Sequence, residues 1–140
     1  MKMMMFLLLS AAALMLSPAV AKAINRDSRE NLQKIIDIAR QYNGSATLHY
    51  FVEDLSALAV GCKDKFFCKA YAILNTTEHF RGTLEEVNLV RNLLQYILGT
   101  RANCTNVQKV NGDQETIPKL VTRLLHCATK VFRHGNGTSP

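Results

Sequence analysis

The chain has 140 residues, 48% of them hydrophobic, and its 17 basic and 11 acidic side chains give a formal net charge of +6. This length fits a single domain with its own core, and the charge is compatible with a partner such as an anionic glycosaminoglycan or an acidic protein surface. The basic residues are scattered rather than clustered, which argues against nucleic acid as a partner.

Residues 1–21 predict a secretory signal peptide. After a basic start, an apolar run covers residues 3–16, and small residues follow at 19–21. This order is typical of a leader whose cleavage site lies after Ala21 or, nearly as well, after Ala23. The alternative is a transmembrane anchor, but the run is shorter than the ~20 residues that span a bilayer. We therefore expect a secreted, extracellular protein with no membrane insertion.

Four amphipathic segments predict helices over about 28–42, 64–82, 83–99 and 115–133. The third opens with a capping box, in which Thr83 is followed three residues later by Glu86. The apolar residues expected to face the core are Leu32, Ile35, Ile36, Ala39 and Tyr42 in the first segment, Phe66, Phe67, Ala70, Ile73 and Leu74 in the second, Leu84, Val87, Val90, Leu94, Ile97 and Leu98 in the third, and Ile117, Leu120, Val121, Leu124, Ala128 and Val131 in the fourth.

The connections between these segments are long, very short and long, which favours an all-α, short-chain four-helix bundle with up-up-down-down topology. An up-down-up-down bundle is the alternative, although it needs only short loops. Each long crossover holds an extended segment, at residues 48–52 and 107–110, and these two predict a small β ribbon. We expect the domain to cover residues 22–133 and the tail at 134–140 to be disordered.

Four cysteines in the expected mature chain predict two disulfides. On a helical wheel, Cys68 lies roughly 150° from the apolar centre of its helix, where only a loop can reach it. Cys104 in the second crossover is its natural partner. The remaining pair, Cys62 and Cys127, follows because the first crossover must pass the fourth helix. Free or metal-bound thiols are the alternative, but the chain has no C-x-x-C motif.

No catalytic or metal-binding motif stands out, and we expect neither an enzyme nor a cofactor. The histidines lack a metal-ligand spacing, and a helical phospholipase would require a calcium loop and a His-Asp pair. Glu30, Lys34 and Asp37 form an outward stripe on the first helix, and Leu89, Leu93 and Tyr96 form a second apolar stripe on the third. For that stripe we consider cover by the second crossover or a partner site. Four sequons predict glycosylation, at Asn43, Asn75, Asn103 and Asn136.

Several short segments resemble the interleukin-4/interleukin-13 family of cytokines. Residues 32–36 (LQKII) resemble an L-Q-E-I-I sequence at the start of that family's first helix, and residues 67–70 (FCKA) resemble its F-C-R-A. Residues 91–93 (RNL) match an R-N-L in its third helix, followed by a loop cysteine at the position of Cys104. The resemblance runs in order across most of residues 28–133, with low identity between the segments.

This resemblance implies a monomeric cytokine that dimerises two type I cytokine receptor chains and starts kinase signalling in type 2 immunity. An interleukin-4-receptor-alpha-like chain would bind the first and third helices, with Arg91 as the basic hot spot. A common-gamma or interleukin-13-receptor-alpha-1-like chain would bind the fourth helix at Thr129, Lys130 and Phe132. Lys34 stands where the family has an acidic hot spot, so Glu30 or Asp37 would have to replace it.

Two alternatives remain open from the sequence. One is another short-chain helical cytokine, of the interleukin-2, interleukin-5 or colony-stimulating type. The other is a cationic host-defence or lipid-binding helical protein, which would need basic residues beside an exposed apolar face.

Overall fold

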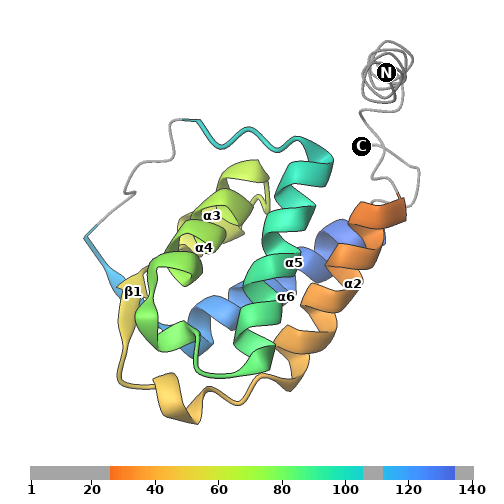
Figure 1. Cartoon of the computed structure of the whole chain (residues 1–140). Helices are drawn as coiled ribbons and strands as arrows, with labels where there is room; N and C mark the ends of the chain where they lie inside the picture. The colour runs from red at the N-terminus through yellow and green to blue at the C-terminus, as the bar shows by residue number, and fades with distance from the viewer. Residues whose placement is uncertain (1–25, 106–111, 135–140) are drawn as a thin grey trace, which may run out of the picture.

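The computed structural model describes residues 26–105 and 112–134. The leader, the predicted strand at 107–110 and the sequon at Asn136 lie outside the described residues. Most of the described part is helical, with a small two-stranded sheet at one end (Figure 1). Its elements in chain order are α2 (Arg26–Gln41), η2 (Gly44–Thr47), β1 (Phe51–Glu53), α3 (Ser56–Ala59), α4 (Asp64–Thr76), η3 (Glu78–Phe80), α5 (Leu84–Thr100), β2 (Gln114–Thr116) and α6 (Ile117–His134).

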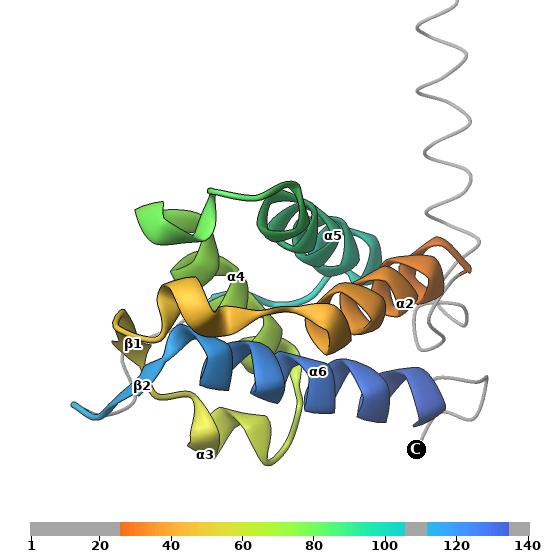
Figure 2. The same cartoon turned by 90° about the horizontal axis from the view of Figure 1, so that it is seen from below.

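Helix α2 holds the bundle together, because it packs against both α5 and α6 (Figure 2). Helix α4 packs mainly against α5, and the short α3, which the sequence did not predict, packs against α6. The predicted core positions of α2, α4 and α6 all lie in or against one hydrophobic cluster, which confirms these three amphipathic faces. Among them, the fully buried side chains are Leu32, Ile35, Phe66, Ala70, Leu74, Ile117, Leu120, Leu124 and Ala128.

The predicted core face of α5 is right only in part: Ile97 is buried and Val90 packs against the core, but the helix turns a different apolar stripe inward. Its first turn does have the expected capping box between Thr83 and Glu86. The core, however, takes the second apolar stripe, Leu89, Leu93 and Tyr96, together with Ile97. The predicted core residues Leu84 and Leu98 are instead 74% and 67% exposed, and Val87 is 37% exposed.

Aromatic packing gives a physical reason for this orientation. The ring of Tyr96 packs against that of Phe67 on α4, with 5.0 Å between the ring centroids. Phe67 in turn makes an edge contact with Phe66. Since a large aromatic side chain gains more from burial than a leucine, the stripe that contains the tyrosine faces inward.

The predicted end of the second helix, at Arg81-Gly82, is also wrong. Helix α4 ends at Thr76, and a 3₁₀ turn at Glu78–Phe80 leads to α5. The hydroxyl groups of Thr76 and Thr77 both donate to the carbonyl of Ile73, which is the kind of local competition that weakens a helix. The turn then buries Phe80 completely.

A small β ribbon is present as predicted, but its strands are Phe51–Glu53 and Gln114–Thr116, whereas the predicted segments were 48–52 and 107–110. Strands β1 and β2 pair antiparallel, with Val52 opposite Glu115. The second strand is Gln114–Thr116, so the fourth helix begins at Ile117 and not at Glu115 as predicted. Helix α6 then continues to His134, one residue into the predicted tail.

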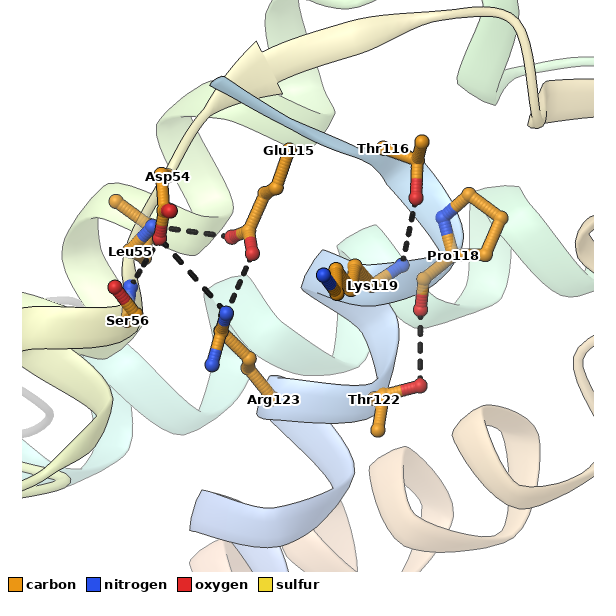
Figure 3. A network of polar contacts seen from close by, with 9 residues as sticks. All are labelled: Asp54, Leu55, Ser56, Glu115, Thr116, Pro118, Lys119, Thr122 and Arg123. Atoms are coloured by element: carbon orange, nitrogen blue, oxygen red, sulfur yellow. Dashed lines mark hydrogen bonds and ion pairs between the residues drawn. The ribbon is translucent and has the colours of Figure 1, made fainter. Parts of the chain in front are cut away.

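A buried carboxylate explains the late start of α6 (Figure 3). Glu115 is 4% exposed, accepts a hydrogen bond from the backbone N–H of Leu55 at 3.0 Å and accepts another from Arg123 Nε at 2.6 Å. Beside it, Asp54 lies 3.9 Å from the Arg123 guanidinium. The Ser56 backbone N–H, at 2.7 Å, lowers the pKa of the Asp54 carboxyl. These contacts require extended backbone at Glu115 and fasten the ribbon to α6.

The first turn of α6 accommodates Pro118 as expected, since a proline there removes no helical hydrogen bond. The hydroxyl of Thr116 accepts a hydrogen bond from the Lys119 N–H at 3.4 Å, and Thr122 donates to the Pro118 carbonyl (Figure 3). This end of the ribbon therefore passes directly into the helix.

Both predicted disulfides are confirmed. Cys62 bonds to Cys127 and joins the segment after α3 to α6. Cys68 bonds to Cys104 and joins α4 to the segment after α5, with 5.5 Å between the two Cα atoms. The first is buried at both ends, whereas Cys104 of the second is exposed. The two bonds thus connect each long crossover to a helix of the bundle.

Candidate functional site

Three of the predicted receptor-facing residues lie around one shallow depression between α2 and α5. Its volume is about 500 Å³. Helix α2 contributes Lys34 and Asp37, and α5 contributes Arg91. These side chains come together because α2 packs closely along α5. The residues that complete the lining are Ile38, Asn88, Asn92 and Gln95.

The close packing of α2 on α5 depends on small residues at one end of the pair. A Cβ atom on Gly99 of α5 would lie 2.7 Å from the hydroxyl oxygen of Ser28 on α2. Because that distance is too short for a contact, any larger residue at position 99 would force the Ser28 side chain or the helix to move. Asn92 is 8% exposed and donates to the Asn88 carbonyl at 2.8 Å, so it forms part of the floor rather than the rim.

The charges around the depression are exposed and available to a partner. Lys34, Asp37 and Arg91 are all exposed. Within the described ranges, none of the four ion pairs includes Lys34 or Arg91. Asp37 accepts a hydrogen bond from Gln33 at 2.9 Å. The rim therefore carries two cations and one carboxylate and favours an acidic group on a partner.

Glu30, the third member of the predicted stripe on α2, is not part of the depression. Its carboxylate lies 3.5 Å from Arg26 Nε at the start of α2, and both side chains are highly exposed. An exposed pair of this kind contributes little to stability. Of the two residues expected to replace the family's acidic group, Asp37 is therefore the one that lies beside Lys34 and Arg91.

Arg91 also lies within a stripe of apolar residues on the outward side of α5. Leu84, Val87, Arg91, Leu94 and Leu98 follow one another at spacings of three and four residues, which places them on one side of a helix. Leu84 and Leu98 are the most exposed of these leucines. We call these five residues the outward stripe of α5. A cation surrounded by exposed apolar side chains is typical of the centre of a protein interface.

A second hollow borders this stripe on the α4 side. Its volume is about 480 Å³, and Leu94 and Ile97 of α5 form one wall. Across from them, α4 contributes mainly apolar atoms, and the Cys68–Cys104 disulfide lies at one end. The outward stripe therefore has a polar depression on one flank and an apolar hollow on the other.

The residues predicted for a second receptor chain lie elsewhere, on α6. Figure 2 shows α6 on the opposite side of α2 from α5. Lys130 is exposed, while Thr129 and Phe132 are half-buried. The guanidinium of Arg29, on α2, covers the Phe132 ring at 4.1 Å from its centroid and donates to the Phe132 carbonyl at 3.1 Å. Phe132 is thus partly covered by a cation–π contact.

Sequence reasoning missed several of these residues. Ile38 lies four positions after Lys34, and Asn88 and Gln95 flank Arg91 at three and four positions, so helical spacing could have identified them. Arg29 carried no such signal, because its contact with Phe132 joins residues 103 positions apart.

The structure describes three of the four predicted glycosylation sequons. Asn43 is exposed, and its side chain accepts a hydrogen bond from the Ser45 N–H at 3.2 Å. Asn75 is half-buried near the end of α4, and its carbonyl accepts a hydrogen bond from Arg81. Asn103 is exposed beside a disulfide cysteine.

Comparison with protein-family models, with curated proteins and with solved structures gave no match. In the described ranges, no helix is long and apolar enough to cross a membrane. The same ranges contain no group of three or more histidine, cysteine, aspartate or glutamate side chains that could hold a metal ion.

Proposed function

We propose that this chain is a secreted cytokine of the interleukin-4/interleukin-13 type, which acts by binding receptor ectodomains and has no catalytic role. The observation that carries the proposal is the α2–α5 surface, where Arg91 is exposed between a polar depression and exposed leucines. Such a combination of a cation with apolar neighbours suits a protein partner that presents a carboxylate among apolar side chains.

The arrangement of the helices supports an up-up-down-down bundle. Followed from the N-terminal to the C-terminal end in Figure 1, α2 and α4 both run downward, and α5 and α6 both run upward. A short turn joins α4 to α5, while the two longer connections contain the paired strands β1 and β2. The disulfide between Cys68 and Cys104 joins the same two elements as the family's loop cysteine would.

The first receptor chain, of the interleukin-4-receptor-alpha type, would bind the α2–α5 surface. Arg91 would pair with a receptor carboxylate, and the outward stripe of α5 would cover that pair from water. Asp37 would take the role of the family's acidic residue, with Lys34 beside it. The second chain, of the common-gamma or interleukin-13-receptor-alpha-1 type, would bind α6 around Lys130, with Phe132 held in place by Arg29.

A binding measurement tests this proposal. Residues 22–140, refolded with both disulfides, are titrated with the interleukin-4-receptor-alpha-like ectodomain of the same species. We expect saturable binding by the wild-type protein and a loss of affinity of at least tenfold in Arg91→Ala, since removing one partner of a desolvated charge pair costs about 2 kcal/mol or more. Arg40→Ala is the matched control, because Arg40 is exposed on α2 but does not line the depression.

Lys34→Glu then tests the reversed charge. If Asp37 has replaced the family's acidic group, adding a second carboxylate beside it will weaken binding; if Lys34 is merely tolerated, binding will stay the same or improve. A correctly folded protein that does not bind this receptor would contradict the family assignment.

The exposed leucines of α5 also favour one function of another class, the disruption of membranes by this cationic protein through an amphipathic helix. Release of dye from vesicles that contain phosphatidylglycerol distinguishes the two. Leakage that is lost in the double variant Leu84→Ser/Leu98→Ser would support membrane disruption, and inert vesicles would eliminate it.

A further inference from the structure

We propose that N-glycosylation of Asn103 and closure of the Cys68–Cys104 disulfide compete in time, so that the sugar can be attached only before the disulfide forms. The sequon is Asn103-Cys104-Thr105, and its middle residue is the exposed end of that disulfide. One segment therefore carries two covalent modifications of the secretory route, and the inference rests on the proposed secretion of the chain.

The disulfide holds this sequon against α4. Cys68 is 5% exposed, and the Cα atom of Cys104 lies only 5.5 Å from that of Cys68. A second contact restrains the residue before it, because the backbone N–H of Asn103 donates to the Asp64 carboxylate at 3.0 Å. One side of the sequon backbone is thus covered by the helix, and an enzyme cannot enclose it.

The two residues of the sequon that a transferase recognises, Asn103 and Thr105, are also hydrogen-bonded to each other. The Thr105 N–H donates to Asn103 Oδ1 at 3.0 Å, and the Thr105 hydroxyl donates to the same oxygen at 2.5 Å. A transferase that recognises the threonine hydroxyl must break this contact. This contact adds to the cost of recognition, beside the attachment of the segment to α4 by the disulfide.

The transfer itself needs access to the side-chain amide. Asn103 Nδ2 forms a bond to the anomeric carbon of a lipid-linked oligosaccharide diphosphate. The carbon–oxygen bond to the diphosphate breaks, the lipid diphosphate leaves with the bonding electrons, and the amide nitrogen loses a proton. None of these changes involves the cysteine sulfur, so the two modifications are chemically compatible and compete only through the position of the backbone.

The reverse order is permitted. The Asn103 side chain is exposed in the folded protein, so a sugar attached early has room outside the bundle. The disulfide can then close beneath it. The secreted protein should therefore be a mixture of two forms, both with the disulfide and only one with a sugar at Asn103.

The experiment is site-specific measurement of glycan occupancy in protein from whole eukaryotic cells, so that retained molecules are counted with secreted ones. The full chain is expressed as wild type, as Cys68→Ala and as Cys62→Ala/Cys127→Ala. Glycosidase release in heavy-oxygen water followed by peptide mass spectrometry gives the occupied fraction of each asparagine. Asn43 and Asn75 serve as internal references, because their sequons contain no cysteine.

We expect partial occupancy of Asn103 in the wild type and at least a doubling in Cys68→Ala, with Asn43 and Asn75 unchanged. The double variant removes the other disulfide and should leave Asn103 at its wild-type value. Treating wild-type cells with a thiol reductant during synthesis should raise Asn103 occupancy without any substitution, which covers the case in which Cys68→Ala fails to fold.

Full occupancy of Asn103 in the wild type, or equal occupancy in wild type and Cys68→Ala, overturns the proposal. An equal rise in both cysteine variants overturns it as well, because general delay of folding would then be the cause. Sugar at Asn43 or Asn75 with unchanged Asn103 refutes the competition alone, whereas protein that stays inside the cells without sugar at any of the three also refutes the secretory route.

Discussion

The two sides of α5 have similar compositions and opposite roles. The inward side, with Leu89, Leu93 and Tyr96, is almost completely buried, while Leu84 and Leu98 on the outward side are mostly exposed. Both sides are apolar enough to form a core. Their difference shows that a helix with two apolar stripes is oriented by its neighbours, and that the stripe left outside is available to a partner.

The largest effect on stability is expected when two leucines of this helix are compared by substitution with alanine. Leu93→Ala should reduce the free energy of unfolding by about 3 kcal/mol, because it removes a completely buried side chain and leaves a cavity. Leu98→Ala should change it by no more than about 0.5 kcal/mol, since that side chain is already in water. Chemical denaturation measures both. Comparable losses in the two variants would contradict the orientation of α5.

A smaller difference in stability is expected between the alanine variants of two neighbouring glutamates in the first turn of α5. Glu86 is buried and accepts hydrogen bonds from the backbone N–H groups of Gly82 and Thr83 and from the Tyr42 hydroxyl, at 3.0 to 3.1 Å. Glu86→Ala should therefore cost about 2 kcal/mol of unfolding free energy. Glu85 is exposed, and Glu85→Ala should cost about 0.5 kcal/mol through the helix dipole alone.

The same denaturation experiment compares the two glutamate variants under identical conditions. If Glu85→Ala were the more damaging of the two, Glu86 would not be the inward residue. The capping box would then make no contribution to the free energy of unfolding.

Local signals in the sequence were sufficient where the structure of a segment depends on that segment alone. The spacing of Thr83 and Glu86 predicted the start of α5, and the position of Cys68 on its helix predicted its loop partner. The apolar faces of α2, α4 and α6 were also predictable, because each of these helices has a single dominant apolar stripe.

Sequence reasoning failed where a contact with another segment of the chain determines the local structure. Glu115 looked like the first turn of a helix, but its buried bonds to Leu55 and Arg123 keep it in a strand. On α5, periodicity offered two stripes and no means of choosing, whereas the contact of Tyr96 with Phe67 favours one.

The candidate site shows the same division. Helical spacing was enough to place Lys34 and Asp37 on one side of α2, and the structure adds Arg91 from α5 beside them. That Glu30 pairs with Arg26 instead, and that Arg29 covers Phe132, depends on which side chains meet after folding. Neither contact could be derived from the pattern of one helix.

The ionisation of Tyr96 gives the finest test of which side of α5 faces inward. Burial, with a smaller contribution from the Asp64 carboxylate, raises the pKa of Tyr96 from 10.0 to about 12. The folded pKa is therefore above the unfolded value, so the stabilisation that depends on the neutral phenol is complete below pH 10 and is lost as the pH rises toward 12. Tyrosinate absorbance, read directly after a pH jump, follows the ionisation before the chain unfolds.

The difference between wild type and Tyr96→Phe isolates this one phenol. Tyr42, whose pKa burial also raises to about 12, is present in both proteins and cancels in the difference. We expect the difference curve to have its midpoint near pH 12. A midpoint near 10.0, the ordinary value of a tyrosine, would place Tyr96 in solvent. In that case Leu84 and Leu98 would belong to the core, and Arg91 would lose the apolar surroundings on which the proposed receptor contact depends.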